Sequence, residues 1–203
     1  MTMRRLFVAV PLDEAAVQTV VAQVERIRAD RELDAPGERD VRWVRMDGLH
    51  ITLRFLGLTP EPDVPAVGEA VRRAAEGRTG FELRIDGGGA FPNPRRPRTL
   101  WLAVTDGAAE LTSLAEAVNA ALVSAGWPAE ERPFRAHLTV ARSDGVPAGA
   151  DVARRLTEAA TGLDLLSTAD RLVLFESITG GGPARYEPLE TVALQLRPAS
   201  PPQ

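Results

Sequence analysis

Two short patterns contain every histidine of the chain. Residues 50–53 read His-Ile-Thr-Leu and residues 137–140 read His-Leu-Thr-Val. Two imidazoles facing one cleft could act as a general acid and a general base, because histidine titrates near neutral pH. Two threonine hydroxyls beside them could donate hydrogen bonds to anionic oxygens. The set suits an in-line displacement at phosphorus, in which one histidine activates water and the other protonates the leaving oxygen.

Both patterns lie in segments that are expected to be strands. Side chains two residues apart on a strand share one face and lie about 6.6 Å apart. Simple alternation therefore places His50 and Thr52 on one face and Phe55 on the other, and it gives His137 and Thr139 a common face in the same way. One such pattern would most often be a structural histidine. The second copy, 87 residues further on, indicates a duplication around a pseudo-twofold axis.

The surrounding elements predict an α+β fold with largely antiparallel sheets, because strands outnumber helices and several strands neighbour each other as hairpins. Asp13 is placed to cap the first helix, and Gly87 to Gly89 should end a strand. We expect one domain over residues 1–197, with two lobes, and a disordered tail at 198–203. The expected strands are 4–10, 41–45, 49–56, 81–86, 99–105, 136–142, 163–168, 170–179 and 185–196; the expected helices are 13–31, 63–77, 107–125 and 149–161; and the expected loops are 33–40 and 91–98.

The composition excludes several kinds of chemistry. The chain has no cysteine, and all 24 of its basic residues are arginine. Thiolate metal sites and lysyl-nucleotide intermediates are therefore impossible, and two histidines cannot form a three-histidine zinc site. A net charge of −4 is unlike a general nucleic-acid binder but allows a local arginine-lined groove. No segment approaches the roughly 20 apolar residues of a membrane span, so we expect a cytoplasmic protein.

Five segments of the sequence resemble the 2H phosphoesterase superfamily, and specifically its RNA 2′,3′-cyclic phosphodiesterases, historically called 2′-5′ RNA ligases. The two histidine segments are the most specific part of the resemblance, and all four histidine and threonine positions match. The five segments are RLFVAVPLDE (5–14), RWVRMDGLHITLRFLG (42–57), FPNPRRPRTLWLAV (91–104), RPFRAHLTVAR (132–142) and LFESITGGGPARYEPL (174–189).

The resemblance implies two pseudo-symmetric lobes of mainly antiparallel sheet, with helices outside and the active cleft between them. It implies metal-independent hydrolysis of an RNA or nucleoside 2′,3′-cyclic phosphate to a 2′-phosphomonoester, with no cofactor and with 2′-5′ ligation as the reverse reaction. By position, His50 would be the proton donor and His137 the proton acceptor. The expected partners are RNA ends or nucleotides, including tRNA fragments, and the expected state is a monomer.

Further residues are candidates for substrate binding. Arg142 matches a family position that contacts substrate, and Phe55 matches one where an aromatic ring can stack on the base. Phe55 could equally be a core residue, unless a bulge turns it toward the histidines. Arg54 shares the His50 face by alternation and could meet phosphate, or it could be an ordinary surface residue. Arg135 lies two residues before His137 on the same alternation.

Two other regions have weaker claims to the site. The arginines at 95, 96 and 98 lie in a proline-rich loop that could contact an RNA backbone or simply be solvated. Tyr186, the only tyrosine, follows a glycine-rich turn and could border the cleft.

The sequence leaves other functions open. The same site could hydrolyse another small cyclic phosphate, such as ADP-ribose cyclic phosphate, or the cleft could bind RNA ends without turnover. Intact histidine pairs count against a pure binder, since binding needs no acid and base. A metallophosphoesterase is the weakest contender, because no compact group of acidic ligands lies near either histidine.

Overall fold

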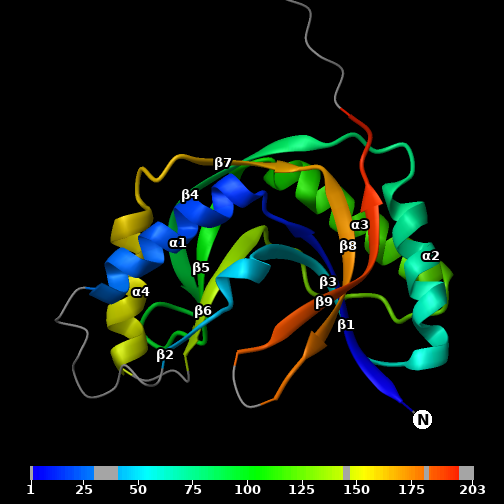
Figure 1. Cartoon of the computed structure of the whole chain (residues 1–203), viewed down its shortest axis with the longest axis horizontal. Helices are drawn as coiled ribbons and strands as arrows, with labels where there is room; N and C mark the ends of the chain where they lie inside the picture. The colour runs from blue at the N-terminus through cyan, green and yellow to red at the C-terminus, as the bar shows by residue number, and fades with distance from the viewer. Residues whose placement is uncertain (1, 30–40, 144–146, 181–182, 197–203) are drawn as a thin grey trace, which may run out of the picture.

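Two antiparallel sheets form the centre of the molecule (Figure 1). The computed structural model describes residues 2–29, 41–143, 147–180 and 183–196. A four-stranded sheet has the order β3-β1-β8-β9, and a five-stranded sheet has the order β2-β6-β5-β4-β7. The strands are β1 (Met3–Pro11), β2 (Val41–Trp43), β3 (His50–Pro60), β4 (Phe81–Phe91), β5 (Thr99–Asp106), β6 (His137–Ser143), β7 (Leu165–Ala169), β8 (Arg171–Ile178) and β9 (Arg185–Ala193).

Helices cover the outer faces of the two sheets (Figure 1). Helices α2 (Val64–Ala75) and α3 (Ala108–Ser124) pack against the four-stranded sheet, whereas α1 (Glu14–Ala29) and α4 (Pro147–Ala160) pack against the five-stranded one. Two helices cross between the lobes. Helix α1 follows β1 of the four-stranded sheet but packs on the five-stranded one, and α3 follows β5 of the five-stranded sheet but packs on the four-stranded one. Neither lobe is therefore a continuous piece of chain.

Strand β1 shows how each sheet separates its two faces. Leu6, Val8 and Val10 are fully buried and belong to the apolar core beneath the helices. Phe7, on the other face, contacts the rings of His50 and Phe175 instead. The face of the sheet that the helices do not cover therefore carries Phe7 and His50, and it is the face available for a functional site.

The predicted α+β class with antiparallel sheets is confirmed, and every predicted helix and strand has a counterpart in the structure. Asp13 caps α1, since its Oδ1 accepts a hydrogen bond of 2.9 Å from the Ala16 N–H. The other carboxylate oxygen accepts one of 3.0 Å from the Ser167 hydroxyl. The cap therefore also ties α1 to β7.

The predicted strand break at the three glycines was wrong, and β3 runs on to Pro60, beyond its predicted end at residue 56. The glycines at 87–89 do not end a strand, because β4 runs through them to Phe91. Gly87 has a φ of +79°, and the pairing with β5 shifts between Ile85 and Gly88, so the glycines form a bulge. A Cβ on Gly89 would lie 2.6 Å from the Trp101 ring, which leaves room only for glycine there.

Some expectations fall on parts of the chain that are not described. The predicted loop at 33–40 and the predicted tail at 198–203 lie outside the described residues. Within the described residues, no helix is both long and apolar enough to cross a membrane.

Candidate active site

The two histidines are held in the same way at the start of β3 and of β6, strands of different sheets that contact each other. Nδ1 of His50 lies 2.7 Å from the Gly48 carbonyl oxygen, and Nδ1 of His137 lies 2.7 Å from the Arg135 carbonyl oxygen. A carbonyl only accepts, so each Nδ1 must carry a hydrogen. Each Nε2 is consequently the nitrogen left to exchange a proton.

Burial and the charge of one guanidinium lower the pKa of both imidazoles. The pKa of His50 is lowered to about 4, mainly by burial and less by the charges of Arg142 and His137, while the hydrogen bond to the Gly48 carbonyl opposes the shift. Burial and Arg142 also lower the pKa of His137, although its bond to the Arg135 carbonyl opposes them. Both rings are therefore neutral at pH 7 in the empty site.

A β-bulge directly after the first histidine pattern corrects the expected faces of two residues. Thr52 pairs with Ala9 and Arg54 pairs with Val8, so Leu53 is an extra residue in β3. Alternation shifts by one position at this bulge. Phe55 consequently shares the face of His50 and Thr52, whereas Arg54, predicted to lie on that face, lies on the opposite one.

Strand β6 contains the same bulge after its own pattern. Thr139 pairs with Trp101 and Ala141 pairs with Leu100, so Val140 is the extra residue. Arg142 then pairs with Thr99 on the His137 face. From the histidine onward, both strands show one order of side-chain burial: half-buried, buried, half-buried, buried, buried, exposed. Phe55 and Arg142 thus occupy equivalent places in the two halves.

A pocket of about 530 Å³ gathers most of the predicted site residues. Phe55 and Arg135 both line this pocket, and the Phe55 side chain is 42% exposed. The arginines at 95, 96 and 98 are exposed and do not line it. The predicted residues that line it are Thr52, Phe55, Arg135, His137, Thr139 and Arg142.

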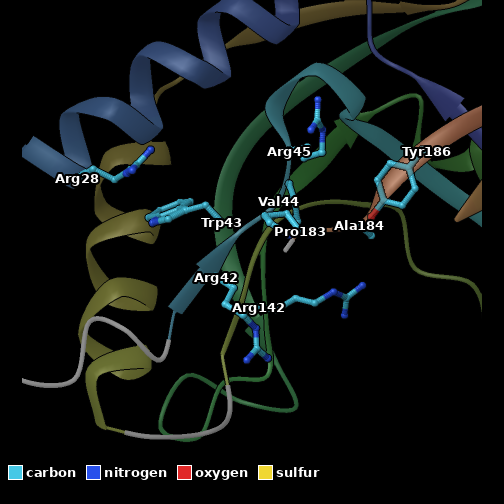
Figure 2. Close-up of a pocket in the computed structure, with 9 residues that line it drawn as sticks. All are labelled: Arg28, Arg42, Trp43, Val44, Arg45, Arg142, Pro183, Ala184 and Tyr186. Atoms are coloured by element: carbon cyan, nitrogen blue, oxygen red, sulfur yellow. The ribbon is translucent and has the colours of Figure 1, made fainter. Parts of the chain in front are cut away.

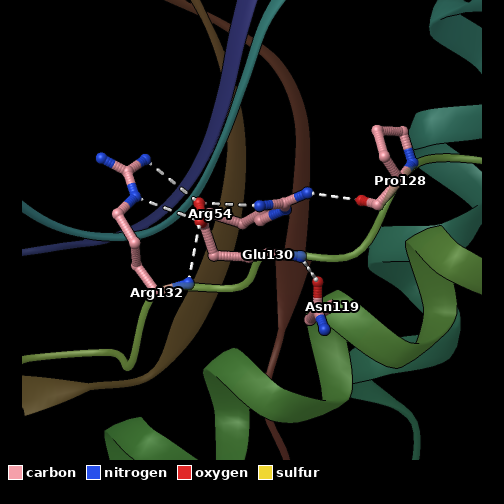
Figure 3. Close-up of polar contacts among 5 residues, drawn as sticks. All are labelled: Arg54, Asn119, Pro128, Glu130 and Arg132. Atoms are coloured by element: carbon pink, nitrogen blue, oxygen red, sulfur yellow. Dashed lines mark hydrogen bonds and ion pairs between the residues drawn. The ribbon is translucent and has the colours of Figure 1, made fainter.

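Arg54 instead forms a buried ion pair behind the site (Figure 3). Arg54 is only 8% exposed. One of its guanidinium nitrogens donates to Glu130 at 2.8 Å, and another donates to the Pro128 carbonyl at 2.6 Å. The Glu130 backbone N–H donates to the Asn119 side chain at 3.0 Å. Arg54 therefore fastens β3 to the segment that leads from α3 to His137.

Of the aromatic rings that contact the histidines, Tyr186 was a candidate from the sequence, whereas Phe7 and Phe91 were not singled out as site residues. Phe7 lies 4.8 Å from the His50 ring and Tyr186 lies 4.9 Å from it, edge-on, which places Tyr186 at the site. Phe91 lies 5.1 Å from the His137 ring. Their positions on strands were visible in the sequence, but which strands face each other was not.

A second cavity, of about 680 Å³, adjoins the first and shares Arg142 with it (Figure 2). Tyr186 borders this cavity from β9, and Trp43 borders it from β2. Among the residues that the structure describes, no group of three or more histidine, cysteine, aspartate or glutamate side chains could hold a metal ion.

Comparisons with known proteins agree on one family. The family model described as the 2′-5′ RNA ligase superfamily matches residues 13–181. A protein of Archaeoglobus fulgidus named RNA 2′,3′-cyclic phosphodiesterase is 33% identical over 159 residues, which cover 78% of this chain and 84% of that protein. One of the same name from Aeropyrum pernix is 40% identical over 105 residues, or 52% of this chain and 58% of that protein.

A solved structure shares the architecture. The crystal structure of Escherichia coli LigT complexed with NADP+ aligns with a TM-score of 0.70 and 25% identity, and the alignment covers 95% of this chain and 99% of that one. The two-lobed arrangement of antiparallel sheets is therefore common to both proteins.

Proposed function

Since the chain belongs to the 2′-5′ RNA ligase superfamily, we propose that it hydrolyses the 2′,3′-cyclic phosphate of an RNA end or nucleoside to a 2′-phosphomonoester. The observation that carries the proposal is the matched pair of histidines. Each has Nδ1 fixed on a backbone carbonyl, and both rings lie within the electrostatic reach of Arg142. The names of the relatives support the same reaction.

The proposed reaction uses one histidine for each proton. Nε2 of His137 takes a proton from water as the water oxygen bonds to phosphorus, and the bond between phosphorus and O3′ breaks. Nε2 of His50 gives its proton to O3′, which leaves a 3′-hydroxyl and a 2′-phosphate. The hydroxyls of Thr52 and Thr139 donate hydrogen bonds to the non-bridging oxygens, where negative charge increases in the transition state.

In this proposal the negative charge of the bound substrate raises the pKa of His50, which can then carry the proton that it donates. His50 is neutral in the empty site because burial and nearby positive charge lower its pKa. A bound phosphate diester brings a negative charge beside Arg142, which offsets that positive charge and raises the pKa of both rings. In this proposal His50 takes up its proton as the substrate binds, and proton donation is confined to the complex.

The pocket that His137 lines suits a nucleoside. Its volume of about 530 Å³ lies within the usual range for small-molecule sites. Phe55 turns an exposed ring into it, and stacking of a base on an aromatic ring contributes about 1–3 kcal/mol. The NADP+ complex of LigT shows a nucleotide bound to a protein of this architecture, which supports a nucleotide ligand here.

Ligation follows when a different nucleophile opens the ring, as the reverse of cleaving a 2′-5′ linkage to a cyclic phosphate. A 5′-hydroxyl in place of water would attack the same phosphorus, expel O3′ and form a 2′-5′ linkage. No lysine is present to carry a nucleotide, so a route through a lysyl-nucleotide intermediate is closed.

The test is hydrolysis of a nucleoside 2′,3′-cyclic phosphate in excess EDTA, with the 2′- and 3′-phosphate products resolved by chromatography. We expect turnover that yields only the 2′-phosphate and is unchanged by the chelator. A 3′-phosphate product, or activity that returns only with an added metal ion, would contradict the two-histidine mechanism. Tight binding of a 2′-phosphate end without turnover would favour an RNA-end-binding module, and turnover of ADP-ribose cyclic phosphate alone would change the substrate.

A further inference from the structure

Aromatic rings from three strands surround the His50 imidazole. Between ring centres, Phe7 of β1 lies 4.8 Å from it, Tyr186 of β9 lies 4.9 Å from it and Phe175 of β8 lies 5.9 Å from it. The two phenylalanine rings are tilted by only 31° and 34° to the imidazole, whereas Tyr186 meets it edge-on at 89°. Tyr186 therefore limits movement of the imidazole in a direction that the two phenylalanines leave open.

Tyr186 also packs against the residue that holds the imidazole. Nδ1 of His50 donates to the Gly48 carbonyl oxygen at 2.7 Å. A Cβ on Gly48 would lie only 3.0 Å from Cδ2 of the Tyr186 ring, so the ring rests directly on the Gly48 backbone. The same ring thus touches both partners of the hydrogen bond that orients His50.

Tyr186 forms a common wall of two cavities. It lines the cavity of about 680 Å³ that contains Arg142 (Figure 2), and it also lines a third cavity, of about 560 Å³, beside α1. Gly48 and Phe175 line this third cavity as well, so it reaches the bond that holds His50. Removal of the ring would join the two cavities at this wall and open a second route for water to the imidazole.

Charged and titratable groups lie around His50 on three elements. They are Arg142 and His137 on β6, the paired Arg45 and Asp47 in the turn before β3, and the Tyr186 hydroxyl on β9. The charges of Arg142 and His137 lower the pKa of His50, but burial is the larger cause. A ring that buries the imidazole therefore affects it without changing any charge nearby.

We propose that Tyr186 is a positioning residue for His50, because its ring holds the imidazole against the Gly48 carbonyl and keeps water of the third cavity away from both. The catalytic meaning of this inference rests on the proposed function, in which His50 is the proton donor. With the ring in place, Nε2 of His50 keeps one orientation toward the substrate. The contacts are made by the ring, so the hydroxyl is not required.

The experiment changes the ring and the backbone beneath it. Tyr186→Phe keeps the ring, and Tyr186→Leu removes it. Gly48→Ala adds a methyl group that displaces the ring from below; Gly48 has no positive φ, so alanine suits its backbone. The double variant Gly48→Ala, Tyr186→Leu shows whether the two changes act through the same contact.

Two measurements are made on each variant. The chain has only two histidines, so NMR titration of the imidazole C–H signals gives two curves, and His50→Gln assigns them. Steady-state kinetics on a nucleoside 2′,3′-cyclic phosphate give kcat and KM. Phe91→Leu is the matched control for the titration, because its ring lies 5.1 Å from His137 instead.

We expect Tyr186→Leu to raise the pKa of His50 from about 4 toward the ordinary 6.5 and to leave the pKa of His137 nearly unchanged. Phe91→Leu should do the reverse. Tyr186→Leu should lower kcat by about 10–100-fold with little change in KM, since the substrate charge already keeps His50 protonated in the complex and orientation is what is lost. Tyr186→Phe should keep both values.

Gly48→Ala should lower kcat in the unchanged chain and add little to Tyr186→Leu, because both changes remove one contact. It also replaces Tyr186→Leu in the titration if that variant does not fold. A raised pKa of His50 in Gly48→Ala supports the inference, and an unchanged one contradicts it.

Two titration results would overturn the inference and leave the proposed function intact. They are an unchanged pKa of His50 in Tyr186→Leu, and an equal shift of both histidines, which would indicate a general loosening of the fold. If the unchanged chain does not hydrolyse the cyclic phosphate, the proposed function fails and the titration still decides the contact. A shift confined to His50, present in Tyr186→Leu and absent in Tyr186→Phe, would then support it.

Discussion

The strands β3 and β6 are alike in backbone and differ in one decisive side chain. Each carries histidine and threonine on its inner face, each has a bulge after the threonine, and each then exposes the third residue beyond that threonine. That residue is Phe55 in one strand and Arg142 in the other. In the proposed mechanism the duplicated backbone supplies the paired acid and base, and the difference at this one position separates an apolar half of the site from a cationic half.

The neighbouring strands extend this contrast. Phe55 stacks on Phe7 with ring centres 5.9 Å apart, whereas Arg142 donates to the Thr99 hydroxyl at 3.4 Å. Phe7 and Thr99 are the partners of Phe55 and Arg142 in the two pairings. One half therefore suits a base and the other an anionic oxygen, which is the division that a nucleotide substrate requires.

Removing either histidine tests whether the two halves really share one reaction, and it should have the largest effect. His50→Ala and His137→Ala should each lower kcat by roughly 10²–10⁴-fold, the usual contribution of a positioned proton-transfer group. The unchanged chain should show a bell-shaped pH dependence. Loss of the donor His50 should flatten the alkaline limb, and loss of the acceptor His137 should flatten the acid limb.

Circular dichroism of the same variants provides the control, since both should retain the spectrum of the parent chain. If either variant keeps the full rate, the histidines do not form a pair and the equivalence of the strands has no catalytic meaning. If each variant flattens the limb assigned to the other, the roles are reversed.

Variants at Phe55 and Arg142 address the asymmetry itself. Arg142→Gln should lower kcat by about 10–100-fold, because a hydrogen bond to a charged group contributes about 1.5–3 kcal/mol and the phosphate charge grows during the reaction. Phe55→Leu should raise KM by about 5–100-fold through the loss of stacking, with kcat nearly unchanged. Steady-state kinetics on a cyclic mononucleotide separate the two effects. Equal changes in KM and kcat for both variants would argue against a division of the site.

The sequence predicted the histidine pair but not this division. The repeated pattern was visible because its residue types recur, and the alternation of apolar residues located the strands. The bulges were not visible, since Leu53 and Val140 look like ordinary core residues. Simple alternation therefore placed Arg54 on the wrong face, and the side on which Phe55 lies could be raised only as an alternative.

The sequence also did not show that α1 and α3 cross between the lobes. Residues 14–29 do not indicate that α1 packs beside α4 rather than on the sheet that contains β1. The apolar face of an amphipathic helix must be buried, but its sequence does not specify which element covers it. The ring contacts of Phe7 and Tyr186 with His50 depend on this three-dimensional pairing. Local pattern thus predicted the elements and the paired histidines, and long-range pairing decided what surrounds them.

The position before Phe55 and Arg142 differs as well, and it affects stability more than chemistry. Arg54 holds Glu130 and the Pro128 carbonyl, whereas the equivalent Ala141 is a buried apolar residue. Arg54→Met should lower the free energy of unfolding by about 1–3 kcal/mol, because Glu130 loses a charged partner. The Glu130 side chain is 29% exposed, so water limits the loss.

Urea denaturation gives the measurement, with Arg132→Gln as the control. Arg132 bonds the same carboxylate, but its side chain is 84% exposed, and surface changes usually stay within about 0.5 kcal/mol. The double variant Arg54→Met, Glu130→Gln should lose less than the sum of its parts. An equal loss for Arg54→Met and Arg132→Gln would show that burial of the ion pair has no special importance.

The smallest expected effect is on the pH dependence of stability, and it comes from the burial of His50. Burial lowers the pKa of His50 from the ordinary 6.5 to about 4, so the unfolded chain binds a proton between these values and the folded chain does not. Stability from this group is therefore present above pH 6.5 and is lost as the pH falls toward 4. His50→Gln should show a smaller fall in melting temperature between pH 7 and pH 5 than the parent chain, by a few degrees. Carboxylates such as Asp13, whose pKa is also lowered, contribute equally to both proteins, so the difference isolates the histidine. An identical fall in both would mean that His50 keeps its ordinary pKa and that the two half-sites are electrostatically alike.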